Sequence, residues 1–134
     1  MIPKFRAWNT FHNKWVKHFY ITENGLIYNM QQPHRDLIGA VPIEKSGLVV
    51  MQSTGLFDKN GKEIFEGDAV VVYDELNEFE SEVYEIVYSQ DNLAWIFYDN
   101  KSHDFYLIST CTWDELEIIG NIYENPELVE VLND

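Results

Sequence analysis

Apolar and polar residues alternate over short stretches of this chain, a spacing typical of strands that bury one face. Turn-forming residues separate the stretches, and Asn24-Gly25 is the clearest of these signals. The pattern predicts strands at 4–8, 15–21, 26–28, 48–52, 63–65, 69–73, 82–88, 93–98, 105–108 and 117–123. We therefore expect a mainly β fold, with a small barrel or sandwich from Gly47 onward, where reversals recur every 8–12 residues or so.

The predicted organisation has two parts. Residues 29–46 contain Pro33, Gly39 and Pro42 and show little periodicity, so they read as a connection with one helical turn. We expect an N-terminal β-hairpin region with this connection over 1–46, and a small β-barrel with a short C-terminal helix over 47–134.

The turns of the second part supply the predicted structural residues, which are Asp58, Asn60, Gly61 and Gly67. Gly61 suits a positive φ, and Glu66-Gly67-Asp68 predicts a second tight reversal. Asp58-x-Asn60-Gly61 has part of the spacing of a calcium loop. Leu56 and Gly67 would occupy the first and twelfth positions of such a loop, where neither offers a side-chain oxygen, so the segment is interpreted as a turn.

Three features near the C-terminus depart from the strand pattern. Thr112 to Glu115 fit a capping box and predict a single helical turn. Gly120 inside the last strand predicts a bulge or a close backbone contact. Asn125-Pro126 predicts the start of a terminal helix, whose apolar face would hold Leu128, Val131 and Leu132.

The composition fits one ordinary domain or a compact barrel with short appendages, since the chain has 134 residues and is 46% hydrophobic. The single cysteine, Cys111, excludes an internal disulfide. The longest apolar stretch, 93–98, is far too short to span a bilayer, and the first residues lack an apolar signal segment. We expect a soluble cytoplasmic protein that does not bind membranes.

Charge is unevenly distributed along the chain. Residues 1–66 are net +2, whereas residues 67–134 hold 17 of the 23 acidic residues and one base, Lys101, for a net charge of −16. This balance disfavours direct nucleic-acid binding by the second half. The acidity has three readings: solvated surface, a face for a basic partner, or a mimic of nucleic acid. The expected protein-contact surface is the acidic loop, with Asp74, Glu75, Glu78, Glu80 and Glu82.

Candidate catalytic and metal-binding residues are few. The histidines His12, His18, His34 and His103 are scattered, and Cys111 has no CxxC neighbour, so neither a zinc site nor a nucleophile is assigned. Phosphate-binding loops and nucleophile elbows are absent from the sequence. We expect no cofactor and no catalytic activity. The abundant carboxylates leave open a dispersed acid–base pair that sequence alone does not identify.

Three blocks of the sequence resemble the YopX family: Lys4 to Trp8, Met51 to Asp68, and Ile119 to Leu128. They occur in the expected order and span nearly the whole chain. The family is carried by bacteriophages and prophages of Gram-positive bacteria and has no established activity. The resemblance implies an intracellular phage-derived protein whose second part is similar to an SH3-like barrel, and it supplies no catalytic residues.

Three hypotheses of function follow. The first is a non-enzymatic accessory protein that acts through protein contacts made by aromatic side chains and the acidic loop. The second is an acidic decoy that sequesters a nucleic-acid-binding protein. The third is a small enzyme with a dispersed carboxylate site. Because small β proteins must pair or cover their edge strands, we also expect a homo-oligomer.

Overall fold

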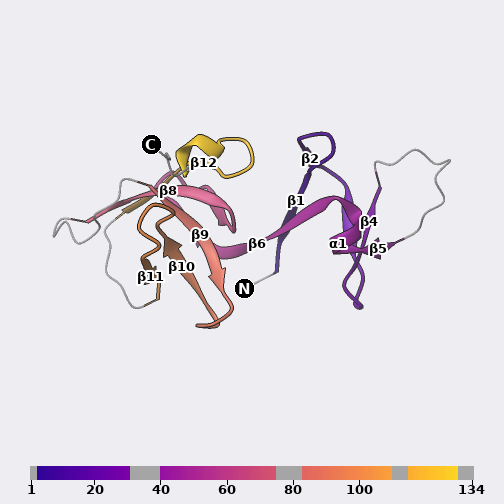
Figure 1. The fold of residues 1–134 in the computed structure, drawn as a ribbon, viewed down its shortest axis with the longest axis horizontal. Coiled ribbons are helices and arrows are strands. Elements are labelled where there is room, and N and C mark those ends of the chain that lie inside the picture. The colour runs from indigo at the N-terminus through magenta and orange to yellow at the C-terminus, as the bar shows by residue number, and fades with distance from the viewer. Residues whose placement is uncertain (1–2, 31–39, 75–82, 110–114, 130–134) are drawn as a thin grey trace. The chain divides into compact units, whose positions relative to one another are not determined.

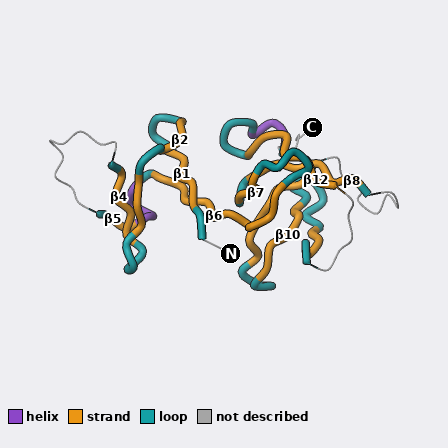
Figure 2. Tube along the Cα trace, turned by 180° about the vertical axis from the view of Figure 1, so that it is seen from behind, coloured by secondary structure: helices purple, strands orange, loops and turns teal. Residues whose placement is uncertain are grey.

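The computed structural model describes residues 3–30, 40–74, 83–109 and 115–129. The chain folds into two compact units, which we call the N-unit (4–51) and the C-unit (52–134, together with 1–3). The boundary predicted from sequence lay between residues 46 and 47. Strands dominate both units, as Figure 2 shows in orange, and the mainly β prediction is confirmed.

The N-unit is built from short strands and one helical turn (Figure 1). Its elements are β1 (Phe5–Asn9), β2 (Lys14–Val16), β3 (Phe19–Ile21), β4 (Leu26–Asn29), β5 (Val41–Pro42), α1 (Ile43–Ser46) and the first half of β6 (Leu48–Phe57). Strand β1 lies between β2 and β6, and β4 lies between β3 and β5. The helical turn α1 occupies the end of the predicted connection, and Gly47 ends it with a φ of +75°.

A small apolar cluster holds the N-unit together. Ala7, Val16, Ile27 and Leu48 are buried at its centre, and five partly buried side chains pack against them: Phe19, Ile21, Val41, Ile43 and Val50. On the opposite face of β1, Trp8 and Trp15 form a T-shaped pair with centroids 5.0 Å apart, and the guanidinium of Arg6 lies 4.7 Å from the Trp15 ring centroid.

The C-unit contains the second half of β6 and a curled five-stranded sheet. Its remaining elements are β7 (Glu63–Phe65), β8 (Asp68–Tyr73), β9 (Tyr84–Ser89), β10 (Ala94–Tyr98), β11 (Phe105–Leu107), β12 (Glu115–Asn121) and the 3₁₀ turn η1 (Pro126–Leu128). The sheet order is β11-β10-β9-β8-β12, with every pairing antiparallel. SH3-like closure of this sheet into a barrel stays a prediction.

The C-unit has the larger core. Seven buried side chains form it: Ile64, Val70, Tyr84, Ile86, Phe97, Ile108 and Leu116. Tyr84 packs its ring near Phe97 and edge-on to Tyr106, with centroid distances of 6.1 and 5.8 Å. The alternation that predicted β9 corresponds to its buried positions, whereas β8 and β10 each bury consecutive residues, in keeping with their continuous apolar runs.

The predicted bulge at the end of the sheet is confirmed. The register between β12 and β8 shifts between Ile118 and Gly120. A Cβ atom on Gly120 would lie 2.5 Å from Asn125 Oδ1 and 2.8 Å from a Leu128 methyl group. Glycine therefore lets η1 pack directly against the bulged strand.

One strand prediction is wrong in detail, and two helical predictions are described only in part. The stretch 15–21 is two strands, β2 and β3, because the exposed pair Lys17-His18 interrupts it and β3 pairs in a different sheet. The C-terminal helix, as far as the structure describes it, is the single 3₁₀ turn η1, and Val131 and Leu132 lie outside the described residues. Residues 112–114 of the predicted capping box also lie outside them, and its last residue, Glu115, begins β12.

No helix in the described portion of the chain has the length and apolar character needed to cross a membrane.

Candidate functional site

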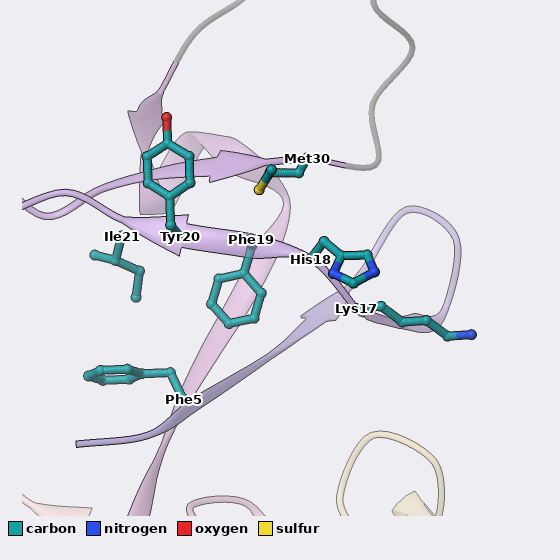
Figure 3. Close-up of a pocket in the computed structure, with 7 residues that line it drawn as sticks. All are labelled: Phe5, Lys17, His18, Phe19, Tyr20, Ile21 and Met30. Carbon is teal, nitrogen blue, oxygen red and sulfur yellow. The ribbon is translucent and has the colours of Figure 1, made fainter. Parts of the chain in front are cut away.

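An open hollow of about 440 Å³ runs along β3 in the N-unit (Figure 3). Its walls are mostly apolar and aromatic, with two basic side chains at one end. The lining residues are Phe5, Lys17, His18, Phe19, Tyr20, Ile21 and Met30. Five of these seven are consecutive, so the hollow follows one short strand and the bend that precedes it.

The pleat of β3 sends its side chains to both sides of the strand. In Figure 3, Phe19 and Ile21 point toward Phe5, whereas Tyr20 points the opposite way. Phe5, Tyr20 and Met30 remain 44%, 51% and 56% exposed. Exposed large apolar side chains that line one hollow are typical of a contact site, whereas scattered single ones carry no such meaning.

Tyr20 is held in place from within its own sheet. Its ring stacks on Tyr28 of β4, with centroids 5.2 Å apart and planes inclined by 22°. These two residues are direct partners in the β3–β4 register. The exposed Tyr20 ring is thereby ordered before any ligand arrives, which lowers the entropy cost of binding.

The lining of the hollow combines aromatic and aliphatic walls with a basic end. Its lining includes no carboxylate, thiol or hydroxyl nucleophile other than the Tyr20 phenol, and its basic groups are Lys17 and His18. Apolar walls with a few polar groups are typical of binding sites.

The structure describes one residue of the acidic contact surface predicted from sequence. Asp74 is half-buried directly after β8. The other predicted members, Glu75, Glu78, Glu80 and Glu82, lie outside the described residues. The charge asymmetry is slightly larger between the two units than between the two halves of the sequence, because the N-unit has a net charge of +3 and the C-unit a net charge of −17.

The predicted structural turns lie in the C-unit and rest on Asp58. Asp58 Oδ1 accepts hydrogen bonds from the backbone N–H groups of Asn60 and Lys62, each at 2.9 Å. Its Oδ2 accepts from the N–H of Ile118 in β12 at 3.1 Å. Burial acts to raise the pKa of Asp58, but these backbone donors together outweigh burial and lower it.

Both predicted turn glycines have the left-handed conformation. Gly61 has a φ of +80° and Gly67 a φ of +87°. The Gly67 N–H donates to Ile86 O at 2.8 Å, and its carbonyl accepts from Ile122 N at 2.9 Å. Gly67, which directly precedes β8, is therefore hydrogen-bonded both to β9 and to the residue that follows β12.

Two carboxylates with raised pKa values lie near each other in the C-unit. Burial raises the pKa of Glu66, and the negative charge of Glu85 adds to the shift. Burial also raises the pKa of Glu85, against the effect of Asn100, whose Nδ2 donates to its Oε1 at 3.0 Å. Both residues belong to the C-unit, whereas the hollow described above belongs to the N-unit.

The histidines and the cysteine are not brought together among the described residues. His103 Nδ1 lies 2.6 Å from the Tyr98 hydroxyl in the turn after β10, and His18 lines the hollow. His34 and Cys111 lie outside the described residues. Where the chain is described, it contains no cluster of three His, Cys, Asp or Glu side chains arranged to hold a metal ion.

Comparison with known proteins identifies relatives over nearly the whole chain. The family described as YopX protein matches residues 4–130. Protein EF1440 from Enterococcus faecalis is 29% identical, with a TM-score of 0.59 over 97% of this chain and 99% of that one. Protein yopX from Bacillus subtilis is 21% identical, with a TM-score of 0.60 over 94% of this chain and 97% of that one. No curated protein matches.

Proposed function

The chain belongs to the YopX family, and on that premise we propose that it is a non-catalytic accessory protein of phage or prophage origin, acting in the cytoplasm through protein contacts. The observation that carries the proposal is the hollow along β3. Exposed aromatic and apolar side chains line this hollow beside β3. Side chains of this kind, once a partner covers them, are the anchors on which protein contacts depend.

The charges of the two units support a contact made by the N-unit. The lining of the hollow contains Lys17 and His18 and no acidic residue, in a unit of net charge +3. An anionic partner that docks at β3 therefore meets little like-charge repulsion there, whereas the C-unit would repel it.

Affinity capture tests this proposal with the full chain as bait in a lysate of cells that carry it. The double variant Phe5→Ala/Tyr20→Ala removes two exposed rings of the hollow. Phe105→Ala is the matched control, since Phe105 is an exposed aromatic of β11 in the C-unit. We expect a partner that persists at high salt, is retained by the control and is lost from the double variant. Equal retention by all three proteins would contradict the proposal.

The charge of the C-unit favours one second candidate, an acidic decoy for a nucleic-acid-binding protein. Capture through carboxylates is screened by salt and competed by DNA, because both act on the same basic surface of the partner. In the same experiment, a partner that is released between low and high salt and by added duplex DNA would support the decoy instead.

A further inference from the structure

In the described part of the chain, the backbone of β3 has a strand neighbour on one side only. Within the described residues, β3 pairs with β4 alone. His18 O accepts from Met30 N at 2.9 Å, and Thr22 N donates to Leu26 O at 2.8 Å. In an antiparallel ladder, hydrogen-bonded pairs alternate with pairs that face outward, so the N–H and C=O groups of Phe19 and Ile21 point away from β4. They form a template for one more strand.

The sequence of this edge is complementary to itself. If two copies of β3 pair antiparallel about a two-fold axis at Tyr20, Phe19 of each copy lies opposite Ile21 of the other. These are the residues whose backbone groups are directed outward. In each of the two Phe19–Ile21 pairs, the N–H of each residue can therefore donate to the C=O of the other. Apolar side chains then lie opposite apolar side chains on the face that holds Phe5.

The opposite face of the strand fits the same register. Tyr20 lies on the axis, and antiparallel residues that are not hydrogen-bonded to each other bring their side chains closest together. Each Tyr20 ring already stacks on Tyr28 of its own copy. Pairing would continue this stack across the axis and cover the ring surface that is now exposed.

Charge selects this register over its neighbours. With the axis at Tyr20, Lys17 in the bend before β3 comes to the same end of the paired edge as Glu23 of the second copy, in the turn after β3, and both side chains are exposed. With the axis at Phe19, Lys17 lies opposite Ile21. With the axis at Ile21, Phe19 lies opposite Glu23. The Tyr20 register is therefore the one of the three that places no charged residue opposite an apolar one.

We propose that the chain forms a symmetric dimer by antiparallel pairing of β3 with β3 of a second copy, in the register that places Lys17 opposite Glu23. The inference rests on the proposed function, because it names a second copy as a partner of the hollow. The contact is made by the unit of net charge +3, which holds three of the 23 acidic residues.

Sedimentation equilibrium of the full chain tests the register by charge reversal. We expect the full chain to form dimers. The dissociation constant should rise roughly 3- to 30-fold in Lys17→Glu, and by a similar factor in the separate variant Glu23→Lys, because each dimer holds two exposed ion pairs. The double variant Lys17→Glu/Glu23→Lys restores the pairs and the wild-type affinity. Net charge alone predicts a different result, since Glu23→Lys makes the chain less negative and would strengthen any non-specific association.

A covalent probe gives an independent measurement. In a Cys111→Ser background, Tyr20→Cys should form a disulfide-linked dimer under mild oxidation, whereas Tyr28→Cys, one strand further from the axis, should not. Circular dichroism verifies that each variant is folded. A monomer at all concentrations, tighter association of Glu23→Lys, or equal cross-linking of both cysteine variants overturns the dimer. Capture of another protein that depends on Phe5 and Tyr20 would preserve the proposed function even then.

Discussion

Asp58 Oδ2 accepts a hydrogen bond from the N–H of Ile118, which joins the turn after β6 to strand β12 across 60 positions of sequence. The same region has two further links, because Lys59 N donates to Leu116 O at 2.8 Å and Lys59 Nζ lies 3.2 Å from Glu117 Oε2. One buried carboxylate therefore holds a local turn and a long-range contact at once.

Replacement of Asp58 should be costly. In Asp58→Ala, three backbone N–H groups lose their acceptor, and we expect a loss of roughly 2–4 kcal/mol in the free energy of unfolding. Asp58→Asn keeps one acceptor oxygen and should cost about half as much. Urea denaturation measures both, with the exposed turn residue Asp91→Ala as the control. A loss below that of the control would contradict the role given to Asp58.

The lowered pKa of Asp58 also predicts an acid limit. Its stabilising effect is fully present above the ordinary pKa of 3.8 and is lost as the pH falls through the lower folded-state value. Asp58→Asn should therefore have a shallower decline in stability than the parent chain below about pH 4. Thermal unfolding at a series of acidic pH values measures the two slopes, and equal slopes would exclude this linkage.

Glu85 predicts a pH dependence of opposite sign. Burial is the main cause that raises its folded-state pKa above the ordinary value of 4.5. The stability of the fold therefore falls as the pH rises from 4.5 through the raised pKa. Glu85→Gln keeps an oxygen that can accept from Asn100 and removes the buried charge. We expect the variant to unfold at higher urea concentration than the parent at pH 7 and at nearly the same concentration at pH 4. Destabilisation at pH 7 would contradict the prediction.

Gly120 is expected to be more sensitive to alanine than a glycine with open space around it. The added methyl group would collide with Asn125 and Leu128, and we expect a loss of about 1–3 kcal/mol. Gly25→Ala is the comparison, since nothing lies within 4 Å of its Cβ position and its φ of +81° alone opposes the change, at roughly 1 kcal/mol. Chemical denaturation ranks the two, and a Gly25→Ala loss that exceeds the Gly120→Ala loss would argue against close packing at the bulge.

Leu93 offers a stabilising change. This residue has a φ of +50° in the β9–β10 turn and is 69% exposed, so its side chain gains little from burial and opposes the left-handed backbone. Leu93→Gly should raise the unfolding free energy by about 0.5–1 kcal/mol. Differential scanning calorimetry measures the change, and Asn92→Gly in the same turn is the control.

Local patterns were sufficient for features that depend on neighbouring residues. Strands β8, β9 and β10, the turn at Gly61 and the bulge at Gly120 each have a signal within a few positions. The break at Lys17-His18 has only a weak signal, because two polar residues between apolar runs fit a continuous strand as well as a bend. The hollow has none, since Phe5 and β3 belong to different sheets and no local pattern predicts that they meet. The contact of Asp58 with Ile118 is missed for the same reason.

The division of charge between the units makes the C-unit resemble a folded polyelectrolyte. With 20 acidic residues against three bases in residues 52–134, its own carboxylates repel one another, and dissolved counterions reduce that repulsion. Sodium or potassium ions near its surface therefore contribute to holding it compact. The N-unit, with six bases and three acids, has little need of them.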